Sequence, residues 1–155
     1  MDRSVDVRAV QGVLYGVYKA LHKMAGNSAA AVMRQAAPDI LTALGKLGVD
    51  FSCVDDIQKL ESKLGETMTA TGMCDEMRFK MEDGNLRANI TNCAFFELTD
   101  QLGKEGIEPF GCPFAALTIA LAERNLGKRA RIKELKPIPG GNRGDTTLLV
   151  ELFDK

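Results

Sequence analysis

The stretch from residue 76 to residue 91 reads EMRFKMEDGNLRANIT. Apolar and charged side chains alternate from Met77 to Met81, and the alternation resumes from Leu86 to Ile90. Between these segments stands the pair Asp83-Gly84, which is typical of a tight turn. Strands joined by a short turn run antiparallel, so this stretch predicts a β-hairpin with one face in solvent.

A second hairpin is expected near the C-terminus. Ala130, Ile132 and Glu134 alternate with basic residues on its first strand. The segment Pro137–Gly144 is rich in proline and glycine and predicts a loop, and Thr147–Phe153 predicts the returning strand.

Helical periodicity dominates the rest of the chain. Apolar residues three and four apart predict helices over Ser4–Ala25, Ser28 to Pro38, Asp39–Leu47, Ile57–Met68 and Phe95–Leu102, and from Pro113 to about Asn125. We expect Ser28 to cap the second of these helices and Pro38 to end it. The order of elements predicts an α+β fold, in which a helical N-terminal half packs on a four-stranded antiparallel sheet made of two hairpins.

The length of 155 residues predicts a single domain over residues 1–155, with helices in 1–72 and both hairpins in 73–155. Twenty basic residues against 21 acidic ones give a net charge of −1, which argues against nucleic acid as a partner. No apolar run approaches the ~20 residues that span a bilayer, and the N-terminus lacks the pattern of a signal peptide. We therefore expect no membrane span and a cytoplasmic location.

Cys112 is the first candidate for chemistry. Pro113 places it at the start of a helix, where free amides and the helix dipole favour a thiolate that could react or bind a metal. Cys93 occupies a similar strand-to-helix transition, so the two could converge on one thiol or metal site. The alternative for both is a small apolar residue packed in the core.

The remaining titratable candidates are weaker. Cys53 and Cys74 could complete a zinc or iron-sulfur site with Cys93 and Cys112, but the four cysteines lack any CxxC spacing. The sole histidine, His22, fits a half-exposed position on the first helix. No catalytic residue is assigned.

Several C-terminal motifs carry a family resemblance. They are Asn92–Glu97 (NCAFFE), Pro109–Phe114 (PFGCPF), Gly127–Glu134 (GKRARIKE), and Gly144-Asp145 followed by Leu148–Val150. In order and shape they resemble the 4-vinyl reductase domain family, which is related in fold to vesicle-tethering-complex subunits and haem nitric-oxide-sensor domains. Of the three cysteines in that family's pattern, only Cys112 is in place.

The resemblance implies a homodimer with a pocket for a small hydrophobic molecule between helices and sheet. We expect Phe95, Phe96, Phe110 and Phe114 to line this pocket and Glu134 to orient the ligand. Cys112 and Cys93 would form the thiol or metal site, with zinc or an iron-sulfur cluster as the possible cofactor.

Three functions stay open at this point. The first is a ligand-binding or sensor domain that needs no catalysis and dimerises through its long N-terminal helices. The second is an enzyme that uses Cys112 as a thiolate nucleophile or as a ligand of catalytic zinc. The third is a structural subunit of an assembly.

Overall fold

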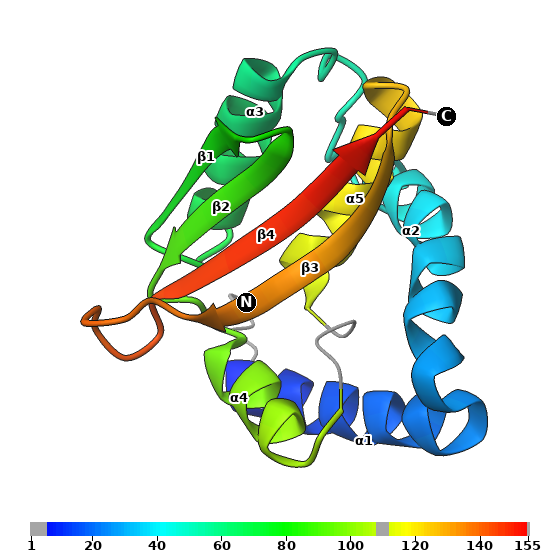
Figure 1. Ribbon diagram of the computed structural model, residues 1–155, viewed down its shortest axis with the longest axis vertical. Helices are drawn as coiled ribbons and strands as arrows, with labels where there is room; N and C mark the ends of the chain where they lie inside the picture. The colour runs from blue at the N-terminus through cyan, green and yellow to red at the C-terminus, as the bar shows by residue number, and fades with distance from the viewer. Residues whose placement is uncertain (1–5, 108–111, 155) are drawn as a thin grey trace, which may run out of the picture.

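A computed structural model describes residues 6–107 and 112–154 (Figure 1). The helices are α1 (Val7–Ala25), α2 (Ala29–Lys46), α3 (Ile57–Ala70), α4 (Phe96–Lys104) and α5 (Pro113–Asn125), with a 3-10 turn at Gly26–Ser28. The strands are β1 (Glu76–Glu82), β2 (Asn85–Thr91), β3 (Arg129–Pro137) and β4 (Thr146–Phe153). The predicted α+β fold is confirmed.

The two hairpins join into one antiparallel sheet of order β1-β2-β4-β3. Helices α3 and α5 cover one face of this sheet, as Figure 1 shows, and α2 packs on α5. Helices α1 and α4 lie side by side at one end of the molecule. The core lies between helices and sheet, with Phe114 from α5, Leu64 from α3 and Leu148 from β4 fully buried.

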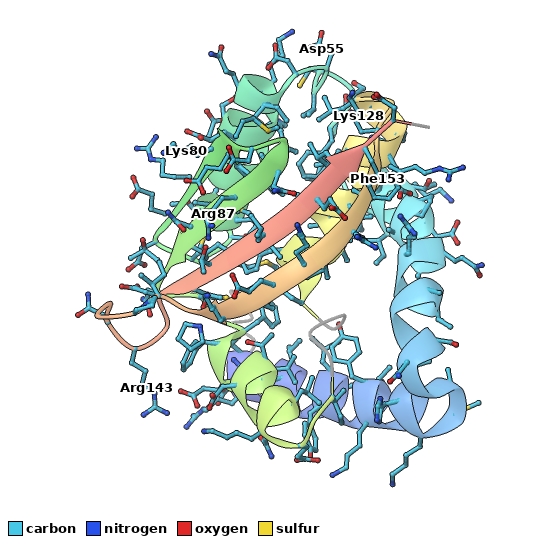
Figure 2. The ribbon with its side chains drawn as sticks, viewed as in Figure 1. Asp55, Lys80, Arg87, Lys128, Arg143 and Phe153 are labelled. Atoms are coloured by element: carbon cyan, nitrogen blue, oxygen red, sulfur yellow. The ribbon has the colours of Figure 1, made fainter. Side chains whose placement is uncertain are left out.

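The opposite face of the sheet carries charged side chains. Figure 2 shows Arg87 and Lys80 on strands that no helix covers from this side. Arg87 pairs with Glu82 at 2.7 Å, and Arg131 pairs with Glu151. Arg131, Lys133 and Lys136 of β3 therefore belong to ion pairs on a solvated face.

The prediction that Pro38 ends a helix is wrong, because α2 runs through it from Ala29 to Lys46. Pro38 has no N–H to donate within the helix, but Ala37 and Leu41 beside it are buried in the core. Packing of α2 on α5 offsets the cost of the missing hydrogen bond. Ser28 stands at the N-cap of α2, as predicted, but its side chain makes no capping hydrogen bond.

No helix within the described parts of the chain has both the length and the apolar character that crossing a membrane requires.

Candidate functional site

The segment between β2 and α4 is held from three sides. The Cys93 amide donates to Gly144 O at 2.8 Å, and the Ala94 amide donates to Met73 O at 2.9 Å. From α1, the Gln11 side chain donates to Ala94 O. These bonds fix the position from which α4 begins and from which Cys93 and its neighbouring aromatic residues project.

Phe95 and Phe114 meet in the core. Their ring centroids are 6.1 Å apart and the ring planes are inclined at 73°, an edge-to-face arrangement. Both side chains are buried. Two of the four phenylalanines predicted at the site therefore come together, from α5 and from the residue before α4.

Three of the four cysteine thiols lie in the interior. Cys74, Cys93 and Cys112 are buried, whereas Cys53 is exposed. Burial raises the pKa of Cys93 to about 12, and the charges of Cys112 and Cys74 add to the effect. Burial likewise raises the pKa of Tyr18 of α1 to about 12, with a further contribution from Cys112. Four separate segments thus bring Tyr18 and the three sulfurs into electrostatic range.

The expectation that the helix start favours a Cys112 thiolate is wrong. Cys112 is the N-terminal cap of α5, and the amides of Ala115 and Phe114 do lower its pKa. Burial acts more strongly, however, and raises the pKa of Cys112 to about 11. Desolvation of a thiolate exceeds the stabilisation by the helix terminus, so the thiol is protonated at neutral pH.

Phe96 faces a different space from Phe95. One face of α4 and the ends of β3 and β4 border a hollow of about 290 Å³ that is open to solvent on one side. It is lined by Phe96, Thr99, Asp100, Gly103, Lys104, Ile107, Leu135, Pro137 and Thr146. Phe96, Ile107, Leu135 and Pro137 form the apolar part of the wall. An ion pair of 2.5 Å between Lys104 and Asp100 lies beside them. The hollow suits a small apolar molecule that would lie beside this ion pair.

Glu134 lies away from both aromatic groups. A β-bulge falls between Ile132, which pairs with Val150, and Glu134, which pairs with Leu149. The extra residue turns Glu134 to the charged face of the sheet, where it pairs with Lys136 at 2.5 Å. Phe110, the other predicted lining residue, lies outside the described residues.

The same bulge explains why sequence reasoning missed Leu135. Simple alternation from Ala130 places Leu135 on the solvent face, but after the bulge it pairs with Leu148 and lines the hollow. Ile107 lies just after α4, and Pro137 is the last residue of β3. At such positions periodicity does not predict which way a side chain points. Only the apolar character of Leu135 among charged neighbours signals an inward position.

No group of three or more histidine, cysteine, aspartate or glutamate side chains that could hold a metal ion is found within residues 6–107 and 112–154. Cys93 and Cys112, the predicted thiol pair, lie close enough that the charge of Cys112 contributes to the raised pKa of Cys93. Whether they take part in metal binding stays a prediction.

Two comparisons with known proteins give matches to this chain. A family model described as "Putative rubredoxin C-terminal domain" matches residues 10–144. Among solved structures, subunit 3 of the trafficking protein particle complex from Naegleria fowleri, covalently bound to palmitic acid, matches with 13% sequence identity and a TM-score of 0.46. That match covers 97% of this chain and 84% of the other. A search of curated proteins finds no match.

Neither match names the 4-vinyl reductase family, so that resemblance stays a prediction. The family model spans most of the chain, from α1 to the end of the loop before β4. The chain therefore belongs to the family described as the rubredoxin C-terminal domain.

Proposed function

We propose that this domain binds a small apolar molecule in the hollow between α4 and the ends of β3 and β4. The observation that carries the proposal is the pairing of an apolar wall, formed by Phe96, Ile107 and Leu135, with a rigid support behind it. The residue before Phe96 packs edge-to-face on Phe114, so the start of α4 is anchored in the core. When a ligand binds to a wall that is already fixed in place, less conformational entropy is lost by the protein.

The buried thiols favour binding over thiol chemistry. A nucleophilic cysteine acts as its thiolate, and a depressed pKa is what activates it. The pKa values of Cys112 and Cys93 are instead raised by burial, to about 11 and about 12. We therefore do not assign Cys112 the role of a nucleophile, and the proposal needs no catalysis.

The word rubredoxin in the family description points to iron or another metal. The residues described do not fit such a site, since no three potential ligands gather in them and Cys53 is exposed apart from the buried thiols. No step of the proposed function uses a metal.

Three wider features complete the proposal. The domain extends over residues 1–155, which is supported by one core cluster that joins both halves of the chain. Its location is the cytoplasm, which is supported by four free cysteines. Its partner is a second copy of the same chain, which is supported by exposed apolar residues on α1.

Filling the hollow tests the proposal. Gly103 lines it from α4, and a Cβ built on Gly103 meets nothing within 4 Å. Gly103→Leu should therefore occupy the hollow without removing any packing. The probe is naphthalene, a rigid apolar molecule, titrated while methyl NMR signals of Ile107 and Leu135 are followed.

We expect saturable shifts of both methyl signals in the native protein and at least tenfold weaker binding in Gly103→Leu. The matched control is Gly45→Leu, since Gly45 lines a separate hollow at the end of α2 and also has open space around it. That variant should bind naphthalene like the native protein. Equal binding by all three proteins, or shifts confined to methyl groups elsewhere, would contradict the proposed site.

A further inference from the structure

The sheet has two edges of different character. Strand β3 forms one of them, and the bulge after Ile132 interrupts its regular pairing, which is one way in which proteins blunt a sheet edge. Strand β1 forms the other edge (Figure 1). Its register with β2 is continuous from Glu76 to Glu82. Strand β1 therefore offers a regular row of backbone groups that can pair with a further strand.

A groove of about 970 Å³, open to solvent, runs between this edge and helix α3. We name it the α3 groove, and its lining consists of one face of α3 together with residues 75–79. Gly65 lets the helix lie close to the strand, because a Cβ there would lie 3.3 Å from Met77 O. The helix borders the groove from Ile57 to Ala70, over about 20 Å at 1.5 Å per residue. That length has room for about six residues of an extended chain.

The backbone of β1 already makes one hydrogen bond across this groove. The Phe79 amide donates to Oε2 of Glu61 at 2.7 Å. A carboxylate oxygen of α3 therefore occupies the position at which a carbonyl of an added strand would accept. Alternate residues of an edge strand direct their amides to the same side, so Met77 and Met81 present theirs in the direction of the Phe79 amide.

The α3 groove is acidic. Its lining carries four carboxylates and one guanidinium, a net charge of −3, whereas the whole chain has a net charge of −1. These charged residues are Glu61, Glu66, Asp75, Glu76 and Arg78. Arg78 lies between two of the carboxylates, 2.8 Å from Glu76 and 3.4 Å from Glu61. Negative charge is thus concentrated along the free edge of the sheet, where it favours a basic partner.

We propose that the α3 groove binds an extended basic segment of a partner protein, which adds to the sheet as a further strand beside β1. Carbonyl groups of this segment accept from the outward amides of β1, and Glu61 leaves the Phe79 amide to pair with a basic side chain. Alternate side chains of a strand point to opposite faces. Lysine or arginine side chains on the α3 side meet Glu61 and Glu66, and their aliphatic stems cover Ile57 and Phe79.

This binding surface is separate from the site of the proposed function. Among the described residues, the α3 groove and the hollow beside α4 have no lining residue in common. The two proposals can therefore fail independently. Naphthalene binding tests the hollow, and peptide binding tests the α3 groove.

The probe is a heptapeptide of sequence KTKTKTK with fluorescein at its N-terminus, titrated with the full chain and followed by fluorescence anisotropy. We expect saturable binding at 20 mM salt and at least tenfold weaker binding at 300 mM salt, because salt screens exposed charges. A second peptide carries N-methyl groups on two neighbouring central residues, which preserves every charge. One of those two amides faces β1 in either register, so this peptide should bind at least fivefold more weakly than the first.

Charge reversal on the protein tests the place of binding. Glu66 is exposed on α3 and lines the groove, so Glu66→Lys should weaken binding of the first peptide at least fivefold. The matched control is Asp39→Lys, which makes the same change of charge at an exposed position of α2 outside the groove. It should bind the peptide like the native protein. Circular dichroism checks that both variants keep the native helix content.

Amide NMR of the native protein gives a direct readout of strand addition. The Phe79 signal should shift on peptide binding, since its acceptor changes from the Glu61 carboxylate to a peptide carbonyl. A native protein that shows no saturable binding at 20 mM salt would overturn the proposal, and so would equal weakening by Glu66→Lys and Asp39→Lys. Equal binding of the N-methylated peptide, or an unchanged Phe79 signal, would overturn strand addition at β1.

Discussion

Gly144 offers a sharp test of how the loop before β4 positions Cys93. Its φ of +98° lies in a region that side chains other than glycine rarely adopt. A Cβ added there would lie 3.3 Å from Asn92 Cα and 3.5 Å from Cys93 N. Both neighbours are backbone atoms, and Gly144 O accepts the Cys93 amide at 2.8 Å, so neither side can move away freely.

Gly144→Ala should therefore destabilise the protein. The positive φ costs an alanine about 1–2 kcal/mol, and the tight contact adds at least about 1 kcal/mol. With a urea dependence of roughly 2 kcal/mol per molar, the unfolding midpoint should fall by about 1–2 M. The measurement is urea unfolding followed by circular dichroism at one fixed protein concentration, because self-association shifts the midpoint.

Gly12→Ala is the matched control. Gly12 lies within α1, and a Cβ there meets nothing within 4 Å. Alanine should stabilise the helix by about 0.5–1 kcal/mol. If Gly144→Ala unfolds at the same urea concentration as the native protein or higher, the account of this close approach is refuted.

Four further outcomes are expected. Asp145→Ala should cost about 1–3 kcal/mol in urea unfolding, because its carboxylate accepts two backbone amides, at 3.1 and 2.9 Å, that would lose their partner. Pro38→Ala should raise the melting temperature by about 3–8 °C in calorimetry, since alanine restores a helical hydrogen bond. In thiol titration at pH 8 Cys53 should react first, and Cys53→Ser should abolish this fast phase. Burial raises the pKa values of Cys112 and Cys93, so the free energy of unfolding should fall as pH rises from about 9 toward 12. The slope should reach about 1.4 kcal/mol per pH unit for each thiol. Cys112→Ala should make this decline shallower.

The proposed site was only partly predictable. The family resemblance implies Phe96 as a lining residue, and Phe96 borders the hollow beside α4. Glu134 was expected beside it, yet the bulge after Ile132 turns Glu134 to the charged face and brings Leu135 inward. A single inserted residue reverses the direction of every side chain that follows, and periodicity alone does not reveal where it stands.

Local sequence patterns were enough to specify most of the elements of this protein. Alternation and the Asp83-Gly84 turn specify the first hairpin, and helical periodicity specifies α1, because both depend on neighbours within a few residues. How those elements meet depends on the folded structure: β2 lies beside β4, α2 continues through Pro38, and the two faces of α1 are divided between core and solvent. These outcomes depend on contacts between residues far apart in the chain, whose packing outweighs local preference. The protonation of Cys112 also depends on such distant contacts. The helix start favours the Cys112 thiolate, but burial by residues far apart in the chain disfavours the thiolate more strongly.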